Sequence, residues 1–200
     1  MSQTLWQLSG DDGVTYYREK DVTKALAKMR KRGINDVPGL YKGEAAFLRK
    51  MARKAPDGAA LEIGVRFGYS ILQWGQERVG RGRIIGIELV DRPLLRENIR
   101  KSGIHVEMLI GDSGKLPLFA SPLAFLFIDG DHREPGLLRD INRYIPFVIP
   151  DGIVVFHDYR HNRKQYPDVR VTECVRAWRL RNGWPKLGRV RHAIAFQRPE

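Results

Sequence analysis

The sequence contains a single cysteine and no long hydrophobic run. Because Cys174 has no second cysteine to pair with, an intramolecular disulfide framework and a cysteine-clustered zinc site are excluded. No stretch of about eighteen apolar residues is present, which excludes an evident membrane-spanning helix. Residues 1–13 also lack the basic start and the apolar segment of a signal peptide. We therefore expect a reduced, cytoplasmic protein that does not enter a membrane.

Acidic residues are scarce toward both ends of the chain. The formal net charge is +12, to which residues 1–56 contribute +6 and residues 159–200 contribute +8, whereas residues 57–158 carry −2. A basic excess can indicate a nucleic-acid or other polyanionic partner. Because the middle of the chain is slightly acidic, the charge instead indicates basic flanks around a core. A nucleic-acid partner stays open but is not favoured, since no RNA-binding module is recognisable.

From residue 59 onward, apolar strand patterns alternate with helical patterns. This alternation is typical of a doubly wound α/β fold with a mainly parallel sheet. The patterns predict strands over 60–65, 83–90, 105–112, 123–131, 152–159 and 192–198, and helices over 69–78, 92–101, 137–144 and 171–181. Upstream, the patterns predict basic helices over 21–32 and 42–54, and the polar residues 1–12 are expected to be loose. Residues 1–56 are thus expected to form a basic helical extension packed on a core domain of residues 57–200.

In a doubly wound sheet, ligands bind beyond the carboxyl ends of the strands, and the end of the first strand is such a position. It carries Glu62, followed by a turn with Gly64 and Gly68 and then Ser70. The glycines permit a tight turn, and the following helix start can bind a carboxylate or phosphate. Arg66 stands where a dinucleotide fingerprint has its second glycine, and no Gly-Lys-Ser/Thr follows. The loop is therefore neither a dinucleotide fingerprint nor a P-loop.

The next two strand ends carry carboxylates. Glu88 lies twenty residues after Gly68 and could accept hydrogen bonds from both hydroxyls of a ribose, or be a plain surface acid. Asp112 and Ser113 could read an adenine edge, or form an Asx turn or helix cap. Their order on successive strands favours a nucleoside site more than any one of them does alone.

The last two strand ends combine acids with histidines. Asp129 and His132 follow one strand, and His157 and Asp158 follow the other. If these two strands are neighbours in the sheet, they lie about 4.8 Å apart, and carboxylates at their ends repel each other unless they are protonated, hydrogen-bonded or bridged by a cation. Mg²⁺ or another divalent cation suits such ligands. His132 could take a proton from an attacking hydroxyl, or only cap its loop.

The segment FIDGDHREPGLLRDINRYIPFVIPDGIVVFHDY resembles the class I S-adenosylmethionine-dependent methyltransferases. Within them it is similar to a small-molecule O-methyltransferase group, the family 24-like enzymes, with FIDGDH and HDY motifs. The resemblance covers about residues 38–200, and Asp151-Gly152 stands where Gly-Gly is usual. It implies a Rossmann-like, doubly wound, mainly parallel seven-stranded sheet with helices on both faces and an antiparallel last strand. The seventh strand is not identifiable from the sequence pattern.

The resemblance also implies site roles. S-adenosylmethionine would be bound by Glu62, Gly64, Gly68, Ser70, Glu88, Asp112, Ser113 and Asp129. A divalent cation would be held by Asp129, His157 and Asp158, with His157 standing where an acid is usual. His132 would act as the base, and Asp129 would share in catalysis. The implied reaction is metal-assisted methylation of a hydroxyl on a small molecule or sugar.

Two other functions remain open at this point. The basic flanks could direct the same chemistry to RNA or another polyanion, or the chain could be a non-catalytic binding protein with a cofactor fold. The segments 33–42 and 160–168 are expected to be lids over the acceptor, and His105 and His192 are expected at the surface. The sequence identifies neither the acceptor, which could be anionic, nor the oligomeric state.

Overall fold

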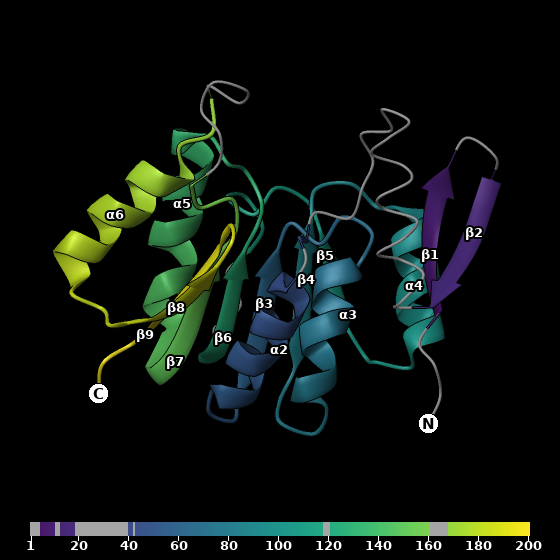
Figure 1. Cartoon of the computed structure of the whole chain (residues 1–200), viewed down its shortest axis with the longest axis horizontal. Helices are drawn as coiled ribbons and strands as arrows, with labels where there is room; N and C mark the ends of the chain where they lie inside the picture. The colour runs from purple at the N-terminus through teal and green to yellow at the C-terminus, as the bar shows by residue number, and fades with distance from the viewer. Residues whose placement is uncertain (1–4, 11–12, 19–39, 42, 118–120, 161–167) are drawn as a thin grey trace.

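The computed structural model describes residues 5–10, 13–18, 40–41, 43–117, 121–160 and 168–200. Its core is a seven-stranded sheet of order β5-β4-β3-β6-β7-β9-β8 (Figure 1). The strands are β3 Ala59–Ile63, β4 Ile84–Glu88, β5 Glu107–Ile110, β6 Leu123–Ile128, β7 Val148–Phe156, β8 Lys186–Val190 and β9 Ala193–Gln197.

The five strands from β3 to β7 are mutually parallel, and β9 runs antiparallel to both of its neighbours, β7 and β8. The predicted Rossmann-like fold, with its antiparallel last strand, is therefore confirmed. β8 is the seventh strand, which the sequence pattern could not locate. It lies at the edge of the sheet and is half-exposed to exposed, so it needs no apolar run.

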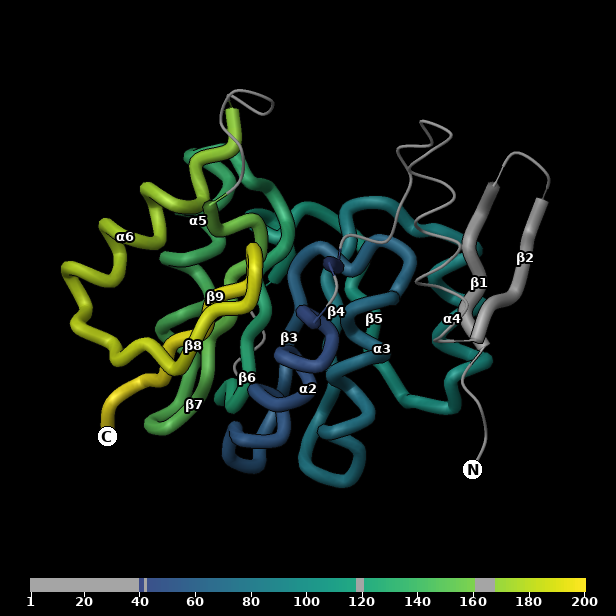
Figure 2. The backbone as a smooth tube through the Cα atoms, in the orientation of Figure 1, coloured from purple at the N-terminus to yellow at the C-terminus, as the bar shows by residue number. Residues whose placement is uncertain are grey.

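Helices cover both faces of the sheet, as the tube trace also shows (Figure 2). The helices are α2 Glu44–Lys54, α3 Tyr69–Gly75, α4 Pro93–Ser102, α5 Glu134–Tyr144 and α6 Val171–Asn182, with short 3-10 turns at Gln76–Arg78 and Ile145–Phe147. Apolar residues of α2, α3 and α4 pack in one cluster against the sheet, and those of α5 and α6 pack in a second cluster. The central strand β6 is buried throughout and contributes to both clusters.

The N-terminal region differs in part from the expectation. Residues expected to be loose form β1 Leu5–Gly10, which pairs antiparallel with β2 Gly13–Arg18. The second predicted helix is present as α2, and its buried side chains place it in the core. The predicted helix over 21–32 and most of the two expected lids, His161 included, lie outside the described residues. The division at residue 56 stays a prediction, and no helix of the described residues is long and apolar enough to cross a membrane.

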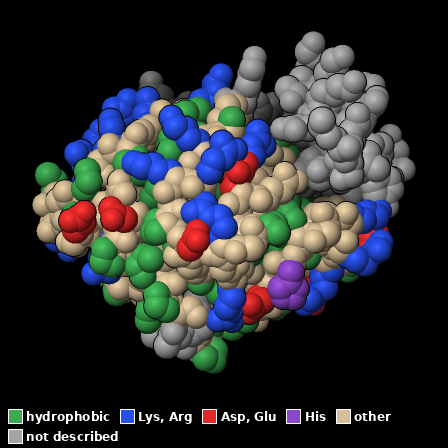
Figure 3. All heavy atoms as spheres, turned by 90° about the horizontal axis from the view of Figure 1, so that it is seen from below, with side chains coloured by type: hydrophobic (Ala, Val, Ile, Leu, Met, Phe, Trp, Pro, Cys, Tyr) green, Lys and Arg blue, Asp and Glu red, His purple; other side chains and the backbone are tan. Residues whose placement is uncertain are grey.

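The end of the sheet at which the parallel strands begin carries paired charges. On the face drawn in Figure 3, basic side chains lie beside acidic ones. Ion pairs in the turns around these strand starts join Arg81 to Asp57 at 2.6 Å and Arg83 to Glu107 at 2.5 Å. Such exposed pairs contribute little stability.

The opposite end is organised by a close contact between the first loop and β6. Gly64 has a φ of +90°, and a Cβ placed on it would lie 2.2 Å from the carbonyl oxygen of Asp129 and 2.9 Å from the Cα of Gly130. The backbone N–H of Asp129 also donates to the carbonyl of Ile63 at 2.9 Å. Only glycine allows this approach, so the loop after β3 and the end of β6 are fixed against each other.

We predict that Gly64→Ala destabilises the protein by about 3 kcal/mol or more, because a clash with backbone atoms adds to the left-handed backbone strain. Gly103→Ala is the matched control: Gly103 has a φ of +71° and open space where a Cβ would go. It should cost only about 1–2 kcal/mol. Urea unfolding of both variants checks this, and equal losses would show that the Asp129 contact is unimportant.

Candidate active site

The carboxylate of Glu62, at the end of β3, is fully buried and bonded to the helix that follows it. One oxygen accepts a hydrogen bond from Ser70 Oγ, and the other accepts from Trp74 Nε1 at 2.6 Å. Burial raises the pKa of Glu62 to about 8, although both hydrogen bonds oppose that rise. Two predicted cofactor residues, Glu62 and Ser70, are thus brought into direct contact, and they connect β3 to α3.

Glu88 lies at the end of β4 and bonds to the first loop. Its Oε2 accepts the backbone N–H of Arg66 at 2.6 Å, and its Oε1 accepts that of Val90 at 3.3 Å. Arg66 has a φ of +52°, a left-handed conformation that is uncommon outside glycine. Arg92 Nε lies 3.9 Å from Glu88 Oε1 and is buried without a hydrogen-bond partner in the described residues. An unsatisfied donor beside a carboxylate suits a ligand hydroxyl, which can both accept and donate.

Asp112 and Ser113, at the end of β5, form a turn. Asp112 Oδ1 accepts the backbone N–H of Gly114 at 2.9 Å and lies 3.2 Å from a guanidinium nitrogen of Arg139. Ser113 Oγ donates to Asp140 at 2.6 Å. The Asx turn weighed as an alternative is present, and the Asp112 carboxylate remains partly exposed at the edge of the sheet.

The ends of β6 and β7 bring Asp129, His132 and Asp158 together. The Nε2 atom of His132 lies 3.2 Å from Asp129 Oδ1 and 3.0 Å from Asp158 Oδ2. The three side chains each offer one ligand atom, and these atoms all lie within 4.8 Å of one another. Asp158 has a φ of +52°, which turns the chain just after β7. Backbone strain of this kind is frequent at functional sites.

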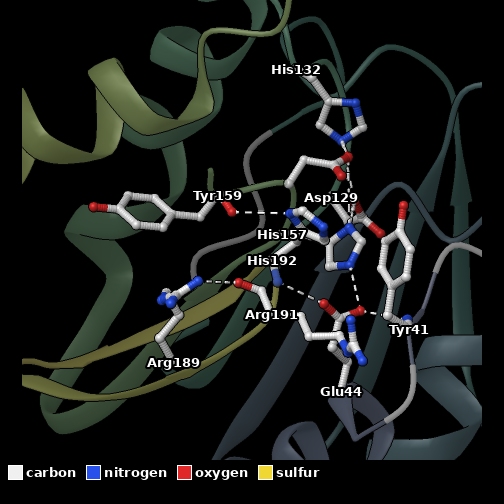
Figure 4. A network of polar contacts seen from close by, with 10 residues as sticks. Tyr41, Glu44, Asp129, His132, His157, Tyr159, Arg189, Arg191 and His192 are labelled. Carbon is white, nitrogen blue, oxygen red and sulfur yellow. Dashed lines mark hydrogen bonds and ion pairs between the residues drawn. The ribbon is translucent and has the colours of Figure 1, made fainter. Parts of the chain in front are cut away.

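His157 lies beneath this cluster and is almost completely buried (Figure 4). Its Nδ1 lies 3.1 Å from Asp129 Oδ1 and 3.7 Å from Asp158 Oδ2. Its Nε2 lies 3.0 Å from the carboxylate of Glu44, which the first turn of α2 supplies. Glu44 is a member of this network that reading the sequence missed, because an acid in a first helical turn looks like an ordinary cap.

Two imidazoles therefore face two carboxylates, and the pKa values reflect this. Burial would lower the pKa of His132, but Asp129 and Asp158 outweigh it and raise that pKa to about 10. Burial likewise opposes protonation of His157, yet Asp129 and its other acidic partners hold its pKa well above the usual range. Burial would raise the pKa values of Asp129 and Asp158, but the two imidazoles outweigh it and lower both values. Protonated rings thus balance the acids in this arrangement.

The donor set also fits a divalent cation. Two carboxylates and an imidazole converge on one point at the partly buried ends of β6 and β7. They are suitable ligands for Mg²⁺ or Mn²⁺. The set that converges is Asp129, His132 and Asp158, whereas the prediction named His157 in place of His132. His157 is tied to Glu44 through one nitrogen, so only its Nδ1 could face a cation.

Of three further ionisable residues, two lie apart from this cluster and one lies beside it. Asp131 forms an ion pair with Arg133 at 2.9 Å, and His105 is exposed, as expected. His192, expected at the surface, is instead half-buried, and its backbone N–H donates to Glu44 at 2.9 Å. His192 is therefore only partly at the surface, and the expectation holds in part.

The strand order, together with acids at successive strand ends, defines the class I methyltransferase architecture. NovP, a solved O-methyltransferase, superposes with a TM-score of 0.66 at 17% identity, covering 86% of this chain and 88% of its own. TomG from Streptomyces achromogenes, solved in complex with SAM, gives 0.63 at 18% identity, covering 92% and 91%. At such identities the likeness is one of fold.

Sequence comparison identifies the family. A family model described as a methyltransferase domain matches residues 61–159, which span the first loop through the HDY motif. The chain therefore contains a methyltransferase domain, and its sheet has the fold of the class I S-adenosylmethionine-dependent methyltransferases. Uncharacterized protein R132 of Acanthamoeba polyphaga mimivirus is 28% identical over 116 residues, which is 52% of each chain. The chain therefore spans about half the length of this curated relative.

We predict that Glu62→Gln becomes progressively more stable than the parent chain as the pH rises. Because the pKa of Glu62 is raised on folding, its carboxyl group contributes fully to the stability of the folded protein below its ordinary pKa of 4.5. This contribution to stability is lost as the pH rises through about 8. Glutamine stays neutral throughout, so the difference should grow by up to about 1.4 kcal/mol per pH unit in this window.

Urea unfolding from pH 5 to 8 measures this difference. Glu77→Gln is the control, because Arg53 lowers the pKa of Glu77 and its loss cannot produce such a rise. A pH-independent difference for Glu62→Gln would show that the Glu62 carboxylate is ionised in the folded protein.

Proposed function

We propose that the protein transfers the methyl group of S-adenosylmethionine to a hydroxyl oxygen of a small acceptor, with assistance from a divalent cation. The observation that carries this proposal is the convergence of Asp129, His132 and Asp158 at the ends of β6 and β7, next to the loop after β3. The names of NovP and TomG as O-methyltransferases support oxygen as the atom that is methylated.

The cofactor would lie across the ends of β3, β4 and β5. Glu88 and Arg92 would bind the ribose hydroxyls, because the carboxylate accepts and the unsatisfied Arg92 Nε donates. Asp112 and Ser113 would lie at the adenine end, and the turn around Gly68 would face the methionine part. In these roles the methyl group would lie near Asp129, since Gly64 holds the first loop against that residue.

The acceptor would lie over β6 and β7. A divalent cation bound by Asp129 and Asp158 would supply positive charge that lowers the pKa of an acceptor hydroxyl. His132, with a side chain about one-third exposed at 32%, would take the hydroxyl proton. This role requires a neutral ring, and neutralising the charge of Asp129 and Asp158 is what would release its proton. Alignment of the oxygen, the methyl carbon and the sulfur then supplies much of the rate enhancement.

Isothermal titration with S-adenosylhomocysteine tests the cofactor site. We expect binding to the parent chain and about tenfold weaker binding to Glu88→Gln, since a charged hydrogen bond is lost. Asp91→Asn is a matched control, because Asp91 is exposed and paired with Arg96. Absence of binding to the parent chain at millimolar ligand would refute the proposed function.

Titration with Mn²⁺, followed by electron paramagnetic resonance, tests the cation site without needing an acceptor. Asp158→Asn should weaken Mn²⁺ binding by about tenfold or more, whereas Asp131→Asn should not, because Asp131 pairs with Arg133. Methyl transfer that is unchanged by EDTA would remove the cation from the mechanism.

We further propose that the acceptor carries an anionic group, in keeping with the basic flanks. Three arginines lie on segments that border His132 and Asp158. The backbone N–H of Arg170 donates to the His132 carbonyl at 2.9 Å, and that of Arg160 donates to Thr172 Oγ1 at 2.7 Å. Arg191 precedes His192, whose carbonyl accepts from Tyr159 at 2.9 Å. Within the described residues no ion pair occupies these three guanidinium groups.

Replacing Arg160 and Arg191 with glutamine should raise the KM for an anionic acceptor by about tenfold or more, because charge-assisted hydrogen bonds are lost. The KM for an uncharged analogue should not change, and Arg176→Gln, on the exposed face of α6, should leave both values unaltered. Steady-state kinetics at low and high salt provides the measurement. A rate that is flat across salt for the parent chain would argue against an anionic acceptor.

A further inference from the structure

Glu44 joins three separate segments at the bottom of the site (Figure 4). Its side chain is fully buried. Oε2 accepts the backbone N–H of Tyr41 at 2.7 Å and lies 3.0 Å from His157 Nε2, and Oε1 accepts the backbone N–H of His192 at 2.9 Å. The carboxylate thus contacts the chain before α2, the end of β7 and the turn between β8 and β9.

Helix capping alone does not account for a carboxylate at this position. The two backbone N–H groups need only acceptor oxygens, which a neutral amide could partly provide. Burying a negative charge is costly unless a positive or hydrogen-bonded partner compensates it. Among the contacts that the structure gives to Glu44, the His157 ring is the one that can carry positive charge. The charge of Glu44 is therefore explained by His157.

The contact with Glu44 also decides what the other side of the ring does. With Nε2 held by Glu44, Nδ1 lies 3.1 Å from Asp129 Oδ1 and 3.7 Å from Asp158 Oδ2. Phe127 packs against the same ring at 6.1 Å between centroids, nearly edge-on at 79°. The ring is thus confined from two sides, and its Nδ1 can only face the two carboxylates.

We propose that Glu44 is a positioning residue that acts through His157. It holds the His157 ring so that Nδ1 fixes the orientation of the Asp129 carboxylate, which in turn contacts His132 at 3.2 Å. The importance of Asp129 and His132 for catalysis rests on the proposed function, but the positioning itself does not. Outer groups of this kind typically change activity or metal affinity by about 10–100-fold when they are replaced.

The same carboxylate makes the site depend on two surface segments. The rings of Tyr41 and His192 lie 4.8 Å apart, and the turn bearing His192 is bonded to Tyr159, the last residue of the HDY motif. Because Glu44 bonds to both segments, the orientation of His157 requires that both be in place. Neither segment needs to touch the substrate to affect catalysis in this way.

The experiment compares Glu44→Gln and Glu44→Asp with His157→Gln and the double variant Glu44→Gln/His157→Gln. Glu77→Gln is the control, since Glu77 bonds to Arg53 at the far end of α2. Ring ¹⁵N chemical shifts of His132 and His157 report the geometry without any ligand, and His105, which is exposed and distant, is the internal reference. Thermal unfolding, titration with S-adenosylhomocysteine and methyl-transfer kinetics complete the set.

We expect Glu44→Gln to move the ring signals of both His157 and His132, although Glu44 does not contact His132. kcat should fall by about 10–100-fold while the affinity for S-adenosylhomocysteine stays within about twofold, and Glu44→Asp should recover part of the loss. In the His157→Gln background, the Glu44→Gln effect on His132 should disappear. Unchanged His132 signals in Glu44→Gln, or an effect that persists without His157, would overturn the proposal.

Two further outcomes are decisive. If Glu44→Gln unfolds, the ring signals of His132 are measured in Glu44→Asp and in His157→Gln instead. Unaltered His132 signals in both of these variants would refute the role of His157. If the parent chain does not bind S-adenosylhomocysteine, the proposed function fails, while the ring signals still test the positioning role of Glu44.

Discussion

The site depends on how the Asp129 carboxylate is held. Its Oδ1 atom lies 3.1 Å from one imidazole and 3.2 Å from another, and its own backbone is in contact with Gly64. A half-buried carboxylate is tolerated only when hydrogen bonds or opposite charge compensate it. The surrounding chain must therefore deliver His132 and His157 to the same oxygen. The loop after β3, the end of β6 and the end of β7 all meet at this one residue.

Much of the sheet could be predicted because its strands obey simple patterns. The strand β6 is a continuous apolar run, as expected for a strand covered by helices on both faces. β8 could not be predicted, because an edge strand paired on one side tolerates Lys186, Gly188 and Arg189. The β1–β2 hairpin was not predicted, because the polar composition of the first residues is typical of a loose terminus.

The candidate site could be predicted where its residues lie at the ends of the parallel strands. Glu88, Asp112, Asp129 and Asp158 could be picked out because each follows an apolar run, and parallel strands bring such positions to one edge. Glu44 could not be found, since its contact with His157 joins residues 113 apart in the chain. Which histidine converges with the two acids was equally inaccessible, because it depends on the turn after β6 and on the left-handed backbone of Asp158.

The edge strand β8 has a consequence for how copies of this chain meet. An unpaired strand edge is a template on which a second chain can add a strand. Lys186 and Arg189 are exposed on β8, and the adjoining turn and helix α6 carry further arginines. Two such edges repel each other when they approach, so the basic C-terminal segment also protects the sheet from edge-to-edge aggregation.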